Sequence, residues 1–142
     1  KDNTLISVMT FSKGNIAKGS KAEDGVWELN RFCSDYNYYS PGIASKILSY
    51  FKVNFEWKEI YSYADRRWSE GELYLKTGFA QEGFTSPNYW YVHPNKLKRI
   101  HRFSLRKPKD SEVSESVLRA AEGYLKIWDC GNLKFTMKNS SS

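Results

Sequence analysis

Cysteine and histidine are scarce in this sequence of 142 residues, which has two of each. The cysteines, Cys33 and Cys130, lie far apart, form no C-x-x-C motif and have no histidine pair beside them. That pattern argues against zinc, and the sequence predicts no metal site. Both cysteines fall in or beside expected strands, where reduced and buried thiols are the usual state. A disulfide between them is the less favoured alternative.

Long apolar runs are also absent. No stretch approaches the roughly 20 apolar residues that a membrane-spanning helix needs, and no signal-peptide pattern is visible. We therefore expect a cytoplasmic protein with no membrane partner. Aromatic residues are plentiful at 16%, which argues against disorder. The length suits a single domain, expected over residues 1–138 and excised from a longer protein, followed by a disordered tail at 139–142.

Acidic residues are outnumbered: the net charge is +6, and no acid occurs between Lys96 and Lys109. A cluster of cations interleaved with aromatic residues is typical of nucleic-acid-binding surfaces. A strand over residues 99–105 would place Lys98, Arg102 and Arg106 on one face. The alternative is a solvated edge strand whose cations discourage aggregation. The residues expected to contact nucleic acid, with DNA as the expected partner, are Arg67, Lys98, Arg99, Arg102, Arg106 and Lys107.

The first half of the chain reads as a unit with two parallel strands joined by a helix. Residues 5–11, 26–33 and 59–64 are rich in strand-forming side chains, and residues 12–25 suggest an exposed hairpin loop. A helix that starts after Gly42 has apolar residues at helical spacing. Strand, helix and strand in this order predict a crossover with parallel pairing. The predicted fold class is α/β, with a twisted mixed sheet and a few helices.

Two features of this unit are candidate sites. Gly42 precedes a helix N-terminus, where backbone N–H groups bind phosphate, and a glycine lets an anion approach closely. The alternative for Gly42 is an ordinary helix start after a Pro-Gly turn. Asp65 directly follows a strand, so it lies at the carboxyl end of the sheet, where it would accept a proton from an amine. The alternative for Asp65 is an ion pair with Arg66, Arg67 or Arg102.

The second half is predicted to be richer in strands. A short helix over residues 69–76 has Ser69 as its N-cap and Gly78 at its C-terminal end. Strands are expected at 79–84, 88–93 and 99–105, and an amphipathic helix from Asp110 or Ser111 to about residue 122. Residues 124–129 and 133–137 suggest a final hairpin around Cys130.

Two motifs in the middle of the chain resemble the Gcn5-related N-acetyltransferase (GNAT) superfamily. The first, YSPGIA from Tyr39 to Ala44, is similar to the family's Q/R-x-x-G-x-G/A pyrophosphate loop. The second, EGELYLKTGF from Glu70 to Phe79, is similar to the family's A-x-x-L-Y-x-K-x-G-F helix. The resemblance implies a GNAT-like core without the usual N-terminal strand and helices. Here Tyr39 replaces the usual Gln or Arg, and Arg67 stands where the second motif usually has Asn.

The strings SYADRRWS, PNYWYV and GYLKIWDCGNLKF further resemble a phage-type branch of this superfamily. That branch includes the DNA-modifying protein Mom and the C-terminal domain of phage homing-endonuclease-like proteins. The resemblance implies a phage origin, the host cytoplasm as location, a DNA partner and a nuclease domain in the same full-length protein. The implied function is an acyl-CoA-dependent transferase associated with DNA modification. The alternative is a non-catalytic nucleic-acid-binding module of an endonuclease-like protein.

The resemblance also implies roles for individual residues. Tyr74 stands where a tyrosine of the family protonates the departing thiolate of coenzyme A, and its alternative role is to pack beside Leu73. Asp65 would be the base, and Ser69 a catalytic hydroxyl by analogy with Mom. Acetyl-CoA or a related acyl-CoA is the implied cofactor. The residues implied to bind it are Tyr39, Gly42, Ile43, Ala44 and Ser45.

Overall fold

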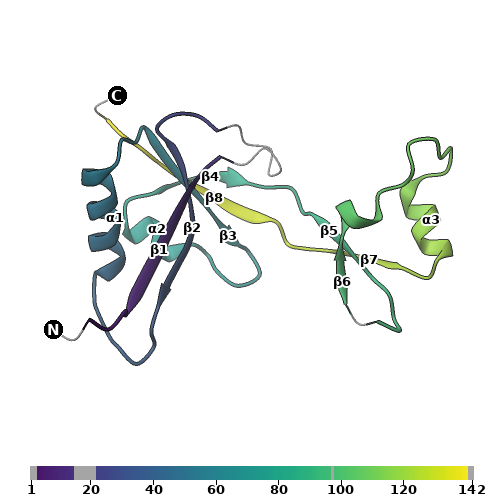
Figure 1. The fold of residues 1–142 in the computed structure, drawn as a ribbon, viewed down its shortest axis with the longest axis horizontal. Helices are drawn as coiled ribbons and strands as arrows, with labels where there is room; N and C mark the ends of the chain where they lie inside the picture. Colours follow the sequence, from purple (N-terminus) through teal and green to yellow (C-terminus); the bar gives the residue numbers. More distant parts are fainter. Residues whose placement is uncertain (1–2, 15–21, 97, 141–142) are drawn as a thin grey trace. The chain divides into compact units, whose positions relative to one another are not determined.

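The computed structural model describes residues 3–14, 22–96 and 98–140. The chain forms two compact units, and each is described by itself (Figure 1). Residues 1–84 and 133–142 build unit 1, and residues 85–132 build unit 2. In chain order, unit 2 is inserted between two strands that are neighbours in the sheet of unit 1. The single domain over residues 1–138 stays a prediction. No helix in the described ranges is long and apolar enough to cross a membrane.

Within its described residues, unit 1 is a five-stranded mixed sheet with two α-helices. The strand order is β1-β2-β3-β8-β4, in which β1 and β2 are antiparallel, β2 and β3 parallel, and β4 and β8 antiparallel. The predicted parallel crossover is therefore confirmed. The strands are β1 (Ser7–Lys13), β2 (Val26–Ser34), β3 (Glu59–Asp65), β4 (Ala80–Phe84) and β8 (Asn132–Lys138). The helices are α1 (Ile43–Asn54) and α2 (Glu72–Lys76).

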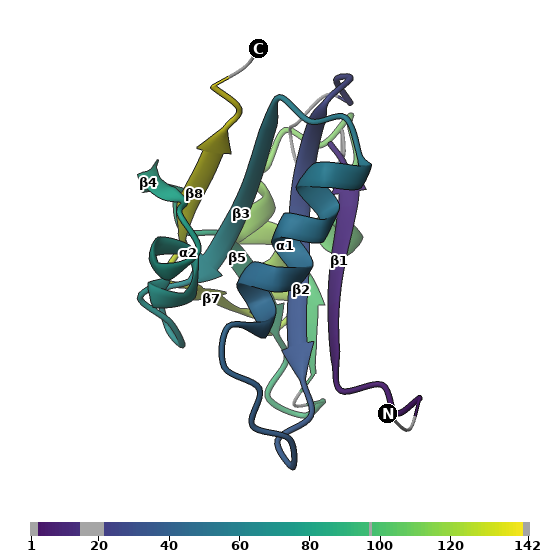
Figure 2. The same cartoon turned by 90° about the vertical axis from the view of Figure 1, so that its left-hand side faces the viewer.

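The core of unit 1 lies where α1 covers the sheet (Figure 2). The buried residues of α1 are Ala44, Leu48 and Phe51, which recur at helical spacing along one face. The Phe51 ring stacks on Phe11 of β1, with ring centroids 3.7 Å apart. Packing of this kind fixes the position of α1, and with it the helix N-terminus that the sequence singles out.

Unit 2 is a three-stranded antiparallel sheet in the order β6-β5-β7. Its strands are β5 (Tyr89–Val92), β6 (Arg99–His101) and β7 (Leu125–Trp128). A 3-10 helix, η2 (Arg102–Leu105), follows β6, and α3 (Glu115–Ala121) precedes β7. The phenols of Tyr89 and Tyr91 both donate hydrogen bonds to Glu115 Oε1, at 3.1 Å and 2.9 Å. These bonds tie α3 to β5.

The shared carboxylate perturbs the titration of its partners. Burial, and then the hydrogen bond to Glu115, raise the pKa of Tyr91 to about 12. The same two causes raise the pKa of Tyr89. For Glu115, burial alone would raise the pKa, but the hydrogen bonds from Tyr91 and Tyr89 outweigh it and leave the pKa lowered. Glu115 is therefore a charged acceptor at neutral pH, and both phenols stay protonated.

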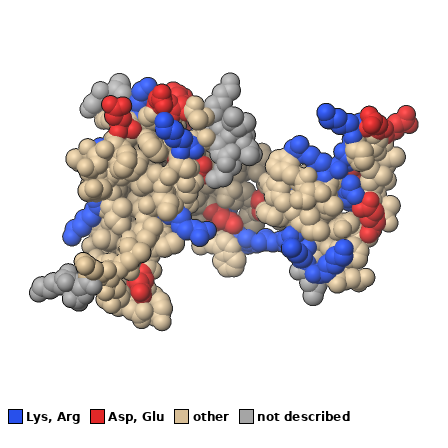
Figure 3. All heavy atoms as spheres, in the orientation of Figure 1, with Lys and Arg blue, Asp and Glu red and all other residues tan. Residues whose placement is uncertain are grey.

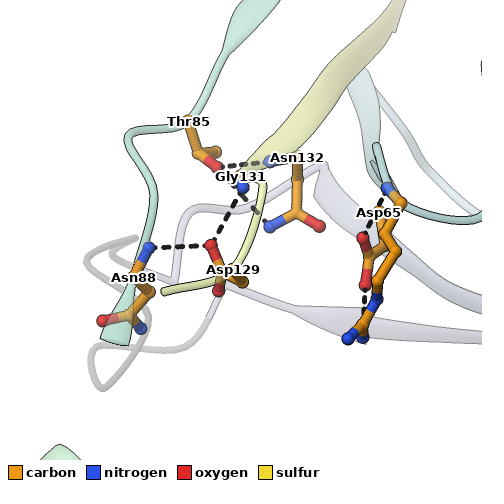
Figure 4. A network of polar contacts seen from close by, with 7 residues as sticks. Asp65, Thr85, Asn88, Asp129, Gly131 and Asn132 are labelled. Carbon is orange, nitrogen blue, oxygen red and sulfur yellow. Dashed lines mark hydrogen bonds and ion pairs between the residues drawn. The ribbon is translucent and has the colours of Figure 1, made fainter. Parts of the chain in front are cut away.

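The predicted final hairpin is wrong. Strand β7 pairs with β5 in unit 2, whereas β8 pairs with β4 in unit 1. The chain between them is held by polar contacts among residues at the two ends of the unit 2 segment (Figure 4). Asp129 Oδ1 accepts hydrogen bonds from the amides of Asn88 and Gly131, and Thr85 Oγ1 accepts one from the amide of Asn132. These bonds join the segment by which the chain enters unit 2 to the segment by which it leaves.

Three further predictions need correction. The strand over residues 99–105 ends at His101, because the His101 ring accepts a hydrogen bond from the amide of Phe103 and the chain turns into η2. Lys98, Arg102 and Arg106 therefore do not share one face of a strand. The helix predicted from Asp110 or Ser111 starts only at Glu115, with Ser114 as its N-cap. Cys33 and Cys130 form no disulfide, and both are exposed, where buried thiols were expected.

Smaller differences concern the ends of the chain and of α2. Gly71, in a left-handed conformation with φ 78°, is the N-cap of α2, so the prediction of Ser69 is wrong by two residues. Asn139, in the predicted tail, donates hydrogen bonds to the carbonyls of Lys58 and Trp57. Residues 15–21 of the predicted hairpin loop, and residues 141–142 of the tail, lie outside the described residues.

Candidate functional site

The Gly42 turn opens α1 with a backbone that favours glycine. Gly42 has φ 72°. A Cβ added at this position would have no neighbouring atom within 4 Å. The amide of Ile43 donates to the Ser40 carbonyl, and the amide of Lys46 donates to the Gly42 carbonyl. The amides of Ala44 and Ser45 lie in the first helical turn, where the helix itself supplies no acceptor. Open space beside first-turn amides is the geometry that suits an anion.

A pocket of about 490 Å³ lies beside this turn. Its wall includes all five residues predicted to bind the cofactor: Tyr39, Gly42, Ile43, Ala44 and Ser45. The end of β2 contributes Phe32 and Ser34, and the segment after it contributes Asp35 and three exposed tyrosines. From α2 come Leu73, Lys76 and Thr77. The structure thus brings the two motifs of the sequence to one pocket.

Lys76 places a cation in the wall of this pocket. Its Nζ lies 2.9 Å from Glu72 Oε2 across one turn of α2. The hydrogen bond from Lys76 holds the pKa of Glu72 below its usual value. Sequence reasoning missed Lys76, although a lysine at a fixed place in the second motif was a usable signal. A surface pair of this kind contributes little to stability, so Lys76 remains able to contact an anion.

Strands β2 and β3 separate toward their carboxyl ends. Their parallel pairing joins Val26–Glu28 to Glu59–Tyr61 and then stops. If it continued, the next pair would be Leu29 with Ser62. At that point a side chain takes the place of backbone pairing, because Ser62 Oγ lies 2.7 Å from the Leu29 carbonyl oxygen. Ser62 is buried, and sequence reasoning gave no reason to select it.

The Tyr74 phenol reaches the point where the strands separate. Its oxygen lies 2.9 Å from Ser62 Oγ. Ser62 is the donor in this contact and also toward the Leu29 carbonyl, so its single hydroxyl proton serves one or the other, and the Tyr74 phenol accepts rather than donates there. The Tyr74 ring stacks on Phe135, with centroids 5.0 Å apart, and meets Phe79 edge-on. Tyr74 is thus packed as a core aromatic and also keeps its polar end at the gap between the strands.

Asp65 and Ser69 make local contacts after β3. Asp65 Oδ1 accepts a hydrogen bond from the amide of Arg67, and its Oδ2 lies 3.4 Å from Arg67 Nη2 (Figure 4). This favours the ion-pair alternative for Asp65. Ser69 Oγ accepts a hydrogen bond from the amide of Gly71. Neither residue lies among those that line the pocket.

The predicted nucleic-acid-binding residues fall in both units. Arg67 belongs to unit 1, where its guanidinium lies over the exposed Trp68 ring at 5.1 Å. The other five belong to unit 2, whose Lys and Arg side chains are visible in Figure 3. Arg99 lies over Trp90, Arg102 over Tyr89 and Phe103, and Arg106 over Phe103. Lys107 donates instead to the Ser111 carbonyl. Lys126 and Trp128 join the same set of contacts, and sequence reasoning missed both.

The fold is similar to that of an acetyltransferase of the GNAT family from Bacillus cereus ATCC 10987. The TM-score is 0.51 at 14% sequence identity, and the match covers 98% of this chain but 66% of that protein, slightly less than two thirds. A scan against protein-family models and a search of curated proteins each find no match. The predicted fold class is confirmed: the chain has a GNAT-like α/β fold with a mixed sheet and few helices.

Proposed function

We propose that unit 1 binds an acyl-CoA in the pocket beside Gly42 and transfers its acyl group to an amine. The observation that carries the proposal is the pocket itself, because its wall unites the Gly42 turn, the first turn of α1 and the α2 motif. First-turn amides and the Lys76 ammonium suit a pyrophosphate, which is an anion with several acceptor oxygens. The open space at the Gly42 Cα leaves room for close approach. The residues present therefore fit the group.

Acyl-CoA supplies an activated acyl thioester, and this chain supplies the groups around it. The gap between β2 and β3 would receive the reacting end, and Tyr74, with its phenol at that gap, would donate a proton to the departing sulfur. Ser62 keeps the phenol in place through their hydrogen bond. We assign Asp65 first to its ion pair with Arg67, so the proton that the amine loses would pass to water. Ser69 is assigned to the turn before α2.

The Gly42→Glu variant is expected to lose acetyl-CoA binding. The carboxylate would stand beside the first-turn amides, where it would compete with phosphate and repel it. Gly42→Gln is the matched control, since it has the same length and the same backbone strain without the charge. Calorimetric titration should show much weaker binding for Glu than for Gln. Equal, wild-type affinity in both variants would reject the pocket as the cofactor site.

A second candidate function is nucleic-acid binding through unit 2. Its 48 residues carry nine Lys or Arg and five Asp or Glu, so a third of the chain holds a net charge of +4. Such a surface favours phosphate, with affinity that falls as salt rises. A DNA substrate or partner, a phage origin and a nuclease domain in the same protein are parts of this proposal that the sequence resemblance supports. The two candidates are compatible, because they use different units.

A further inference from the structure

Unit 2 contains an unbroken alternation of aromatic rings and cations. Lys126 Nζ lies 4.7 Å from the ring centroid of Trp128 and 3.8 Å from that of Tyr89. The Arg102 guanidinium lies 5.4 Å from Tyr89 and 5.1 Å from Phe103. Arg106 lies 4.0 Å from Phe103. We call this set the aromatic–cation ladder: Trp128, Lys126, Tyr89, Arg102, Phe103 and Arg106.

The ladder follows from the strand register. β5 and β7 pair Tyr89 with Trp128 and Tyr91 with Lys126, and directly opposed residues project from the same face of an antiparallel sheet. Arg102 and Phe103 join them because the chain leaves β6 at His101 and enters η2. The Tyr89 phenol is held by Glu115 from α3, which fixes its ring. The surface is thus built by elements that are far apart in the sequence.

The first and last rings of the ladder, Trp128 and Phe103, are exposed. The exposed fractions of Trp128 and Phe103 are 59% and 43%. No ladder cation has an ion-pair partner within the ranges that the structure describes. Glu115 contacts the ladder through the Tyr89 hydroxyl and interacts electrostatically with Lys126. The cations therefore retain charge that a bound polyanion would neutralise.

We propose that the aromatic–cation ladder binds single-stranded nucleic acid by stacking unpaired bases on its rings and contacting phosphates with its cations. This rests on the second candidate function and adds the form of the ligand and the residues that select it. A single strand alternates bases with phosphates, and the ladder alternates rings with cations. In a duplex the base faces are already stacked on one another, so the rings would have nothing to contact. The charge alone would serve either form.

The test compares a labelled oligo(dT) of about 12 nucleotides with a duplex of the same length, using the full chain. Fluorescence anisotropy should show tighter binding of the single strand. Trp128→Ala should weaken that binding about tenfold and leave the duplex little changed, since the variant loses one ring on which a base stacks. Trp128→Phe, which keeps a ring, should stay within about threefold of the wild type. Tyr50→Ala, which removes an exposed aromatic of unit 1, should have no effect.

A charge variant tests the role of the ladder cations while all of the aromatic rings are kept. Lys126→Gln should reduce the slope of log affinity against log salt by about 0.7 for the single strand. Equal binding of both forms, with Trp128→Ala unchanged, would overturn the ladder but leave charge-based nucleic-acid binding standing. Failure to bind either form would overturn both. Thermal unfolding of each variant confirms that a loss of binding is not a loss of fold.

Discussion

Replacing Gly71 with alanine should destabilise unit 1 by about 2–5 kcal/mol. Gly71 has φ 78°, where an L-residue costs roughly 1–2 kcal/mol. Its added Cβ would also clash with the Phe135 ring, and Phe135 is fully buried in the core. Overpacking of a core adds about 1–3 kcal/mol. Denaturant unfolding of the variant and the wild type measures the difference.

Gly42→Ala is the matched control for this prediction. Gly42 has nearly the same φ, 72°, but its Cβ would point into open space. Only the backbone strain remains, so we expect a loss of about 1–2 kcal/mol. The difference between the two variants isolates the contact with Phe135. Equal losses would show that Gly71 is not packed against that ring, and the position of α2 over the core would then be wrong.

Replacing Tyr74 with phenylalanine should slow acyl transfer about 10²–10⁴-fold, the range expected when a positioned proton donor is removed. The ring contacts with Phe135 and Phe79 would survive, so the fold should be kept. Acetyl-CoA binding should also be kept, because Tyr74 does not line the pocket. The measurement is release of coenzyme A thiol from acetyl-CoA in the presence of a panel of primary amines.

Ser62→Ala separates the chemical role of Tyr74 from its structural one. It removes the same hydrogen bond but keeps the phenol, and it leaves the Leu29 carbonyl without the hydroxyl that donates to it. We expect a stability loss of about 1–3 kcal/mol and a rate within about tenfold of the wild type. If Ser62→Ala and Tyr74→Phe slowed thiol release equally, the phenol would be a packing residue. A wild-type chain that releases no thiol would contradict the transferase proposal itself.

Local patterns predicted the first half of the chain well. The helix after Gly42, the strands around it and their parallel pairing were all readable, because apolar periodicity and the strand–helix–strand order restrict the topology. The predicted cofactor residues lie close together in the sequence, so the helix start was enough to bring them together at one pocket.

The second half depends on pairings between distant segments. Residues 124–129 and 133–137 looked like a hairpin because they are adjacent strands with a glycine between them. Their partners, β5 and β4, lie more than 30 residues earlier, and no local signal reveals which strand each one joins. The break at His101 has a similar cause, since a ring-to-amide hydrogen bond overrides the strand propensity of the segment.

The residues that sequence reasoning missed share this origin. Ser62 matters because the strands separate beside it, and Lys126 and Trp128 matter because β7 lies beside β5. None belongs to a motif of its own. Asp65 shows the opposite case: its place at the carboxyl end of a strand was predicted correctly, and the contact with Arg67 sets the surroundings of its carboxylate.

The most direct test of the account is a calorimetric titration of acetyl-CoA into the purified wild-type chain, with a short DNA duplex titrated separately. If the pocket beside Gly42 binds acyl-CoA, acetyl-CoA should show saturable binding at one site. The expected dissociation constant is in the micromolar range, which corresponds to about −8 kcal/mol. The pocket beside Gly42 would then be a cofactor site, and the acceptor would be the next question. An absence of heat with acetyl-CoA, together with salt-sensitive binding of DNA, would contradict it and would make the GNAT-like fold of this chain a nucleic-acid-binding module.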